Sequence, residues 1–516
     1  MKSFPEIGEF SKIFDAGNPQ VIGVKLVADL ETPVSAMLKL AEGLPYSFLL
    51  ESVEGGASRG RYSIIGMKPD VIWRCFGNRA EINRDAISNL EAFNSCPVAD
   101  ASGAMASLRS LITESHIELS AGLPPMAAGL VGYMAYDMVR LVEQLPDTNP
   151  DFLKLPDSIL IRPTVMAIFD ALEDSVTVLT PVWQSAGYNG HNTSPTVAYA
   201  AAEERLAAVV SGLEAPLQIA RPQQKAVHIS EDDVTSNMTE DYFKDMVCRA
   251  KDYILAGDAF QIVPSQRFRM PFDLPPFSFY RSLRRLNPSP FLFYLNFGDF
   301  QVVGSSPEIL VRVRDGKITL RPLAGTRRRG STPSEDEALA NELLNDPKER
   351  AEHLMLLDLG RNDVGRVARV GSVVPTEQFT IEYYSHVMHI ASNVEGELDR
   401  ENFDEIDALM AGFPAGTVSG APKIRAMEII EELETERRGV YSGCIGYFGA
   451  NGDMDTCIAL RTAIIKEKVI YIQAGAGVVA DSDPEAEFAE TVNKAKGLVH
   501  AAEEASRFAN FDEQSG

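Results

Sequence analysis

Two segments in the second half of the chain place paired carboxylates at the start of a predicted helix. Residues 346–352 and 483–490 both begin Asp-Pro and then carry two glutamates three positions apart. An aspartate N-cap followed by proline is typical of a helix start, and residues three apart share one helix face. The four glutamates are Glu349, Glu352, Glu487 and Glu490.

If the two faces meet, these carboxylates cannot all stay ionised unless a cation neutralises them. An oxygen-only set suits Mg²⁺, which uses one or two carboxylates together with waters and substrate oxygens. Lys494 continues the second face, seven residues after Glu487. The alternative is that each pair is a solvated helix face, which is the usual origin of this spacing in so acidic a chain.

Three short loops rich in small residues lie between or beside these segments. Residues 322–327 follow a predicted strand, residues 416–423 open a predicted amphipathic helix, and residues 473–477 end a strand. A helix N-terminus offers free N–H groups to an anion, and glycine lets the backbone approach a ligand closely. Each loop taken alone could equally be an ordinary tight turn.

Together these segments resemble the chorismate-utilising enzymes, and they keep that family's order across most of residues 240–500. The matching segments are 305–308, 322–326, 352–356, 358–363, 387–389, 416–427, 455–461 and the final helix. The first half resembles the N-terminal domain of anthranilate synthase large subunits at residues 49–52, 61–66 and 129–137. The resemblance implies an α+β fold, with large antiparallel β-sheets flanked by helices and an associated N-terminal regulatory α/β domain.

Carried over position by position, the resemblance implies roles for individual residues. The magnesium ligands would be Glu352 and Glu490, supported through water by Glu349 and Glu487. The catalytic candidates are His389, Glu308, Thr417 and Lys494. The chorismate contacts would be Gly325, Thr326, Tyr441, Arg461, Gly475, Ala476 and Gly477.

Chemical character supports three of these assignments. The planar guanidinium of Arg461 can bind both oxygens of a carboxylate. Glu308 would protonate the departing ring hydroxyl, while His389 would orient the substrate or assist the elimination of pyruvate. A lone histidine is more often structural than catalytic, and only the Val-Met-His setting of His389 favours a catalytic role.

Two positions discriminate among the chemistries of this family. Isochorismate and salicylate synthases carry a lysine base where Gln261 stands, and a glutamine cannot activate water near neutral pH. Aminodeoxychorismate synthases carry a nucleophilic lysine where Ala324 stands, and alanine offers no nucleophile. The resemblance therefore favours direct attack by ammonia and release of anthranilate and pyruvate. The alternatives are an aminodeoxychorismate synthase component and a non-catalytic protein that binds chorismate or tryptophan.

A second small-molecule site is implied by two further matches. Residues 50–52 and 287–293 resemble the segments that form a tryptophan feedback pocket, and Tyr447 is expected in its wall. The expected inhibitor contacts are Glu51, Ser52, Pro290, Phe291, Leu292 and Tyr447. The alternative is that these are core strands joined by a proline turn.

The chain lacks a glutaminase nucleophile of its own. Residues 442–446 fail the Gly-x-Cys-x-Gly pattern because Ser442 replaces the first glycine, and Cys444 falls in a predicted strand. We therefore expect a separate glutamine amidotransferase subunit to supply ammonia, in a heterotetramer with two copies of each chain.

Elements of secondary structure are predicted mainly from periodicity. The first half is rich in short strands, with helices expected at residues 104–114 and 197–211. The second half alternates a helix at 240–256 with strands at 259–267, 291–297, 300–304, 309–314, 444–448 and 469–474. The polar stretch 214–239 predicts a boundary between an N-terminal domain (residues 1–230) and a chorismate-binding catalytic domain (231–516).

Composition limits the remaining possibilities. The formal charge of −25 would repel nucleic acid and anionic lipid alike. No apolar run reaches the roughly 18 residues needed to span a bilayer, and no signal peptide is indicated at the N-terminus. The five cysteines are scattered without CxxC spacing, which suits a reducing compartment. We expect a cytoplasmic enzyme that binds neither nucleic acid nor membrane.

Overall fold

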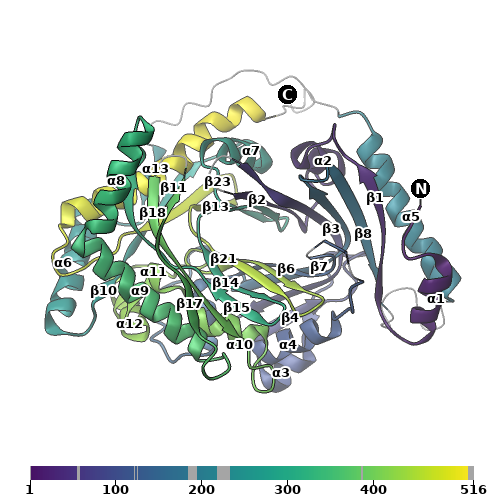
Figure 1. The fold of residues 1–516 in the computed structure, drawn as a ribbon, viewed down its shortest axis with the longest axis horizontal. Helices are drawn as coiled ribbons and strands as arrows, with labels where there is room; N and C mark the ends of the chain where they lie inside the picture. Colours follow the sequence, from purple (N-terminus) through teal and green to yellow (C-terminus); the bar gives the residue numbers. More distant parts are fainter. Residues whose placement is uncertain are drawn as a thin grey trace.

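The computed structural model describes residues 2–54, 58–120, 122–124, 126–183, 194–217, 233–384 and 387–509. Helices lie around a large antiparallel β-structure (Figure 1), which is the predicted α+β class. The helices are α1 (Ile7–Asp15), α2 (Pro33–Leu40), α3 (Pro97–Ser102), α4 (Ala104–Glu114), α5 (Pro195–Glu214), α6 (Glu240–Ala256), α7 (Pro276–Leu286), α8 (Pro333–Asn345), α9 (Pro347–Gly365), α10 (Glu405–Gly412), α11 (Gly416–Ser419), α12 (Lys423–Leu433) and α13 (Pro484–Glu504), with 3₁₀ turns η1 (Tyr136–Leu141) and η3 (Ala505–Phe508).

The strands run the whole length of the described chain. They are β1 (Gln20–Val27), β2 (Ser47–Glu54), β3 (Ser58–Phe76), β4 (Arg79–Asn83), β5 (Asn94–Ser95), β6 (Gly129–Met134), β7 (Ser158–Asp170), β8 (Ser175–Val182), β9 (Thr235–Ser236), β10 (Gln261–Ile262), β11 (Ser265–Pro271), β12 (Phe291–Asn296), β13 (Phe300–Ser306), β14 (Ile309–Arg314), β15 (Lys317–Leu320), β16 (Leu323–Arg328), β17 (Val374–Tyr383), β18 (Val387–Glu397), β19 (Gly420–Ala421), β20 (Cys444–Gly449), β21 (Met454–Ile458), β22 (Thr462–Lys466) and β23 (Val469–Gly475).

The long strands β3 and β7 pair with each other and divide the β-structure into two arms. The register shifts between Pro69 and Val71, and on either side of this irregularity the two strands take different neighbours. One half carries β2 and β8, and the sheet continues through β12, β13, β22, β23 and β11. The other half carries β4 and β6, and the sheet continues through β20, β21, β14, β15 and β18. Strands from the first half of the chain therefore begin both arms.

The chain passes between the arms at two adjacent places. One crossing joins β13 to β14 and contains Glu308, and the other joins β21 to β22 and contains Arg461. The crossings are hydrogen-bonded to each other: the Ile458 amide donates to the Glu308 carbonyl (3.0 Å), and the Ser305 amide donates to the Arg461 carbonyl (3.1 Å). Two backbone segments far apart in sequence are thereby held side by side.

Both predicted Asp-Pro helix starts are present. The Asp346 side chain accepts hydrogen bonds from the first turn of α9, and the Asp483 side chain accepts one from the Ala486 amide of α13. Such caps satisfy amides that have no partner inside the helix. The carboxylate pairs consequently stand on the first two turns of their helices, as the sequence predicts.

The structure differs from the sequence prediction at three points. The single strand expected at residues 259–267 is two strands, β10 and β11, of which β10 pairs with β19 instead of joining the large sheet. Residues 416–423 do not open one helix, because the short helix α11 ends at Ser419 and α12 begins at Lys423. The loop at 322–327 is itself strand β16. Most of the expected interdomain linker, at residues 218–232, lies outside the described residues, so the domain boundary stays a prediction.

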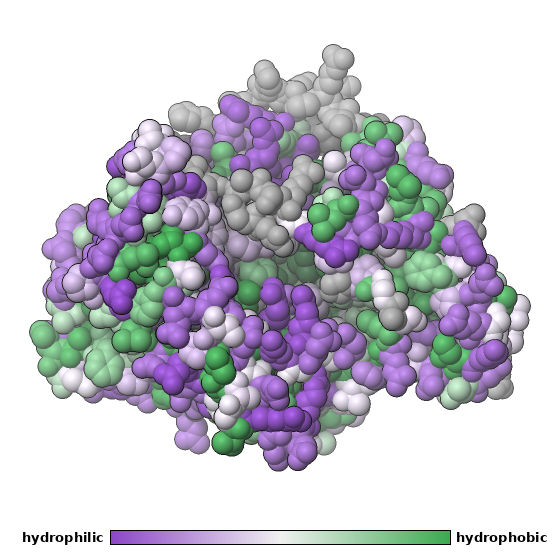
Figure 2. Space-filling view, viewed as in Figure 1, coloured by the Kyte–Doolittle hydropathy of each residue, from purple (hydrophilic) through white to green (hydrophobic). Residues whose placement is uncertain are grey.

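Among the described residues, no helix is long and apolar enough to cross a membrane. Apolar side chains instead fill the interior: Trp73, Tyr280 and Phe293 are among the largest fully buried ones. A hollow is visible near the middle of the face in Figure 2, where Figure 1 places the strands of both arms around a central gap.

Candidate active site

Cross-strand register brings Thr326 and His389 together. The two residues are partners in the β16–β18 pairing, and the register shift between Ala324 and Thr326 leaves Gly325 as a bulge. Gly325 adopts a φ of +73°, which glycine tolerates best. The bulge turns the Gly325 carbonyl toward His389, whose Nδ1 lies 2.9 Å from that oxygen and 3.1 Å from Thr326 Oγ1.

These contacts determine which ring nitrogen of His389 carries the proton, and burial determines its charge. A carbonyl oxygen can only accept, so Nδ1 carries the ring proton and Nε2 keeps a free lone pair. Burial lowers the pKa of His389 to about 4, although the hydrogen bond to Gly325 opposes that shift. The imidazole is therefore neutral at physiological pH and can accept a proton or a hydrogen bond through Nε2.

Glu308 is a buried acid at the first crossing. Its carboxyl group accepts hydrogen bonds from the Leu323 amide (3.4 Å) and from the Thr417 hydroxyl (3.2 and 3.3 Å). Burial raises the pKa of Glu308 to about 8, and the two hydrogen bonds only partly offset this effect. A carboxyl group with such a pKa is protonated at neutral pH and can act as a general acid.

Arg461 occupies the second crossing with a left-handed backbone, φ +47°. Burial lowers its pKa, and within the described part of the chain no carboxylate forms an ion pair with its guanidinium. A half-buried arginine without an acidic partner is suited to receive an anionic ligand.

The end of β23 supplies a tightly packed wall. A Cβ atom at Gly475 would lie 2.8 Å from the Tyr441 hydroxyl oxygen and 2.9 Å from the Pro264 carbonyl oxygen. A Cβ atom at Gly477 would lie 2.8 Å from Gln261 Nε2. Ala476, between the two glycines, donates its amide to the Pro264 carbonyl at 3.1 Å. Only glycine fits at either side of Ala476 without displacing a neighbour.

Gln261 connects this wall to the acidic helices. Its Nε2 donates to Glu352 Oε1 at 2.8 Å, while its buried Oε1 has no hydrogen-bond partner among the described residues. The pKa of Glu352 is raised, chiefly by burial and further by the charges of Glu349 and Glu490. The two glutamate pairs therefore face a common region and repel each other there.

The structure does not gather all four glutamates into one compact cluster. Over the described ranges, no three Asp, Glu, His or Cys side chains are grouped as a metal site would require. Arg327 binds Glu349 (3.1 Å), and Lys494 binds Glu490 (2.6 Å) and donates to the Gly475 carbonyl (2.9 Å). Of the two expected ligands, Glu352 accepts from Gln261 and Glu490 is paired with Lys494. Two carboxylates are a donor set that Mg²⁺ accepts when water and substrate oxygens complete it.

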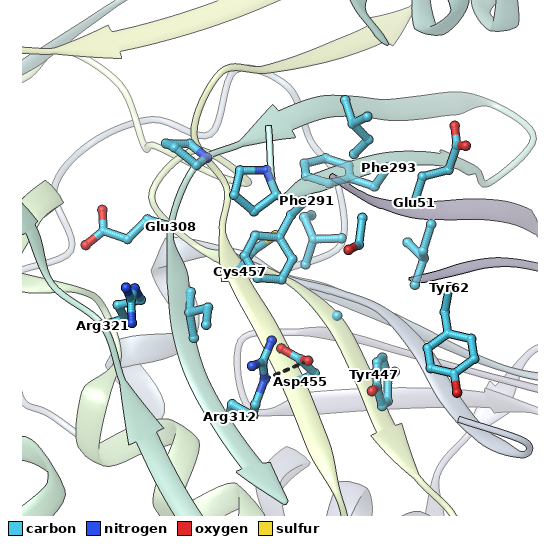
Figure 3. Close-up of a pocket in the computed structure, with 18 of the residues that line it drawn as sticks. Glu51, Tyr62, Phe291, Phe293, Glu308, Arg312, Arg321, Tyr447, Asp455 and Cys457 are labelled. Carbon is cyan, nitrogen blue, oxygen red and sulfur yellow. Dashed lines mark hydrogen bonds and ion pairs between the residues drawn. The ribbon is translucent and has the colours of Figure 1, made fainter. Parts of the chain in front are cut away.

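A cavity of about 610 Å³ lies between the two arms and reaches the candidate general acid Glu308. All six residues expected to contact an inhibitor line it: Glu51, Ser52, Pro290, Phe291, Leu292 and Tyr447. Figure 3 shows Glu51 and Glu308 at opposite ends, with Phe291 and Cys457 between them. The register of β2 against β12, which pairs Glu51 with Leu292, joins the two halves of the chain at this wall.

Two acids of this cavity differ in whether both of their carboxylate oxygens have hydrogen-bond partners. Glu51 is fully engaged, because it accepts from Tyr280 (2.5 Å) and forms two hydrogen bonds with Arg284 (2.6 and 2.9 Å). Asp455 accepts from Arg312 at 2.9 Å through Oδ2, whereas its buried Oδ1 has no partner in the described structure. A buried acceptor without a donor is costly, so Asp455 is placed to receive a donor group from a ligand.

Sequence reasoning missed the polar residues at the catalytic end of the cavity, which include Arg321, Glu382 and Tyr384. Arg321 could have been suspected because it immediately precedes the Pro322–Thr326 loop. Glu382 and Tyr384 carry no local motif, and only the pairing of β17 with β18 brings them to this position.

Comparison with known proteins places this fold and site in a class. The family model described as chorismate binding enzyme matches residues 67–500. The chain therefore belongs to the chorismate-binding enzymes. Within that family, several curated relatives carry the same name. Anthranilate synthase component 1 of Cereibacter sphaeroides is 58% identical over 500 residues, covering 97% of this chain and 98% of the relative. The same component of Pseudomonas aeruginosa is 45% identical over 490 residues, covering 94% and 96%.

Solved structures agree with this placement. Anthranilate synthase component I from Streptococcus pneumoniae superposes with a TM-score of 0.73 at 38% identity, covering 85% of this chain and 92% of that one. The isochorismate synthase MenF from Escherichia coli shares the fold, with a TM-score of 0.68 at 19% identity over 96% of this chain and 98% of that one.

Proposed function

We propose that this chain converts chorismate and ammonia to anthranilate and pyruvate. The names of its relatives support this activity. The observation that carries it is the absence of a lysine at two positions of the site: Ala324 is nearly buried in β16, and Gln261 bonds Glu352. Neither residue can attack the ring or activate water as a base, which by the family resemblance favours ammonia as the nucleophile.

The site residues can be given roles in that reaction. Ammonia adds at C2 of the ring, and the C4 hydroxyl leaves as water once the protonated carboxyl group of Glu308 donates its proton. Removal of the C2 proton then expels the enolpyruvyl group as pyruvate and aromatises the ring. Neutral His389 can orient the substrate or receive a proton through Nε2, and Arg461 can hold a substrate carboxylate.

Glu352 and Glu490 would hold Mg²⁺, with Glu349 and Glu487 supporting it through water. The raised pKa values of Glu352 and Glu487, due mainly to burial and further to neighbouring acids, indicate that this region favours additional positive charge. When bound there, Mg²⁺ would supply the charge that lets a substrate carboxylate approach Glu352 and Glu490.

A separate glutaminase would supply the ammonia, as the word component in the relatives' names suggests. The chain's own nearest resemblance to a glutaminase nucleophile, Cys444, lies in β20 and is buried. Burial raises the pKa of Cys444 to about 12, so its thiol stays protonated and unreactive. The purified chain should accordingly use ammonium but not glutamine. The five cysteines are all free of disulfides, which favours a cytoplasmic location.

The cavity between the arms would bind tryptophan as a feedback inhibitor. Its apolar wall of Pro290, Phe291 and Leu292 suits an indole ring, and the free Oδ1 of Asp455 suits an N–H donor. L-Tryptophan should bind the purified chain in a calorimetric titration and raise the chorismate concentration needed for turnover. Indole-3-propionate, which lacks the amino group, serves as the comparison ligand. Absence of a binding heat with tryptophan would contradict the assignment.

Product analysis separates the proposed activity from its rivals. Chorismate, Mg²⁺ and ammonium should yield the fluorescence of anthranilate, whereas an aminodeoxychorismate synthase would accumulate a non-aromatic amine. Glu352→Gln should abolish turnover at Mg²⁺ concentrations that saturate the wild type. If this variant turned over normally, or if the wild type bound chorismate without any turnover, a non-catalytic binding protein would be the better description.

A further inference from the structure

The cavity and the catalytic site share a wall. Glu308, Leu323 and Tyr384 all line the cavity. Glu308 is also bonded to Thr417 of the active site, and Leu323 begins the strand that carries Gly325 and Thr326. A ligand filling this space would therefore touch residues that themselves touch the catalytic groups.

Tyr384 is the most direct of these connections. Its side chain is only 8% exposed, and its ring packs edge-on against the His389 ring with centroids 5.5 Å apart. The Tyr384 hydroxyl donates to Glu382 Oε2 at 2.7 Å. The imidazole of His389 is thus held between the Gly325 carbonyl on one side and the Tyr384 ring on another.

Arg321 forms hydrogen bonds with the other carboxylate oxygen of Glu382 and with Glu377. Its Nε donates to Glu382 Oε1 at 2.7 Å, and its Nη1 donates to Glu377 at 3.0 Å. Glu382 therefore accepts from Arg321 and from Tyr384 through different oxygens. Arg321 also lies two residues before strand β16, which carries Gly325 and Thr326, so its position is linked to that of these expected chorismate contacts.

We propose that Arg321, Glu382 and Tyr384 couple occupancy of the cavity to the position of His389. This proposal rests on the inhibitor pocket proposed above and adds the residues that transmit its effect. Tyr384 is a positioning residue in this scheme and takes no part in the chemistry. A ligand that binds better when Tyr384 is displaced weakens chorismate binding, and by linkage chorismate weakens that ligand to the same degree.

The adjacent Tyr383 provides a matched control. It also lines the cavity, but it is 41% exposed, and its ring receives the Arg329 guanidinium instead of contacting His389. Tyr383→Phe and Tyr384→Phe remove the same hydroxyl group from neighbouring residues. Only the second change breaks the bond to Glu382. Glu382→Gln weakens the hydrogen bonds of residue 382 to both Arg321 and Tyr384 while nearly preserving the shape of the side chain. It provides a second variant if Tyr384→Phe is poorly stable.

The test measures a coupling factor. The dissociation constant of L-tryptophan is determined by calorimetry on the full chain with Mg²⁺, without chorismate and with saturating chorismate in the absence of ammonium. In the wild type the two constants should differ by at least about fivefold, the lower end of typical allosteric coupling. In Tyr384→Phe and Glu382→Gln the ratio should fall toward one, while the constant measured without chorismate changes less than about threefold. Tyr383→Phe should keep the wild-type ratio.

Two results would overturn the proposal. The first is a wild-type ratio retained in both Tyr384→Phe and Glu382→Gln. The second is a large loss of tryptophan affinity in these variants without chorismate, which would make the two residues part of the binding pocket. A wild-type chain that binds no tryptophan would instead refute the inhibitor pocket itself, so the two failures are distinguishable.

Discussion

The hydroxyl of Thr417 lies 3.2 and 3.3 Å from the two carboxylate oxygens of Glu308. Thr417 belongs to α11, more than a hundred residues beyond the crossing that holds Glu308. The contact ties the general acid to the short helix α11, and it lowers the pKa of Glu308 against the larger upward effect of burial.

This relationship predicts the alkaline limb of the pH profile. Turnover requires protonated Glu308, whose pKa burial raises to about 8, so kcat should fall as the pH rises through about 8. Thr417→Val removes a hydrogen bond that lowers this pKa, and the limb should move to higher pH. Thr417→Ser keeps the hydroxyl and should leave the limb in place. A limb that moves to lower pH in Thr417→Val would contradict the assignment of Glu308 as the acid.

Because burial lowers the pKa of His389 to about 4, no limb near pH 6.5 is expected from this histidine.

Arg461→Lys should weaken chorismate binding. A lysine keeps the charge but loses the fork that binds both oxygens of a carboxylate, and a hydrogen bond to a charged group contributes about 1.5–3 kcal/mol. We expect the KM for chorismate to rise by about 10- to 100-fold with a smaller change in kcat. Arg361→Lys serves as the control, since Arg361 is an exposed residue paired with Asp358. Equal KM values in the two variants would remove Arg461 from the substrate contacts.

Glu352→Gln should reduce the affinity for Mg²⁺. Loss of a residue that merely supports a ligand typically costs about 10- to 100-fold in affinity, so loss of a direct ligand should cost more than about 100-fold. The readout is the Mg²⁺ concentration that half-restores turnover, together with calorimetric binding of Mg²⁺ in the presence of chorismate. Glu485→Gln changes an exposed acid of α13 that pairs with Lys244, and it should behave as wild type. A similar effect of both changes would indicate general charge screening instead of a site.

Gly477→Ala should impair the site without unfolding the protein. The added Cβ would lie 2.8 Å from Gln261 Nε2, which in turn holds Glu352. Overpacking of this kind typically costs about 1–3 kcal/mol, and here the displaced group is in the active site. We expect turnover to fall by at least about tenfold, with a cooperative thermal transition retained. Gly8→Ala, in a helix where an added Cβ meets no atom within 4 Å, should leave turnover unchanged. Normal turnover in Gly477→Ala would show that Gln261 can move without consequence.

Local sequence features predicted the helix starts and most strands well. The Asp-Pro caps of α9 and α13 form because their chemistry is complete within four residues. Helices α4 and α6 have the predicted bounds, since their apolar positions recur at helical spacing. The strand at residues 259–267 was predicted wrongly as one piece, because the break before Ser265 depends on β10 pairing with β19, about 160 residues away.

Non-local structure could not be predicted from spacing alone. Nothing in the sequence near Glu308 or Arg461 indicates that both lie at crossings between the arms, where the Ser305 amide bonds the Arg461 carbonyl. The ion pair of Glu349 with Arg327 likewise arises from tertiary packing, whereas Lys494 pairs with Glu490 four residues earlier on the same helix. The family resemblance supplied residue identities that periodicity could not, whereas Glu382 and Tyr384 emerged only from the shape of the cavity.

The most direct test of the proposed reaction is the stoichiometry of its products. The purified chain is incubated with chorismate, Mg²⁺ and ¹⁵N-ammonium, and anthranilate and pyruvate are quantified over time. We predict equal amounts of the two products, with ¹⁵N in every anthranilate molecule and no accumulation of a hydroxylated isomer. Formation of isochorismate, or of an amine that retains the enolpyruvyl group, would contradict the assignment of a lysine-free site built for ammonia.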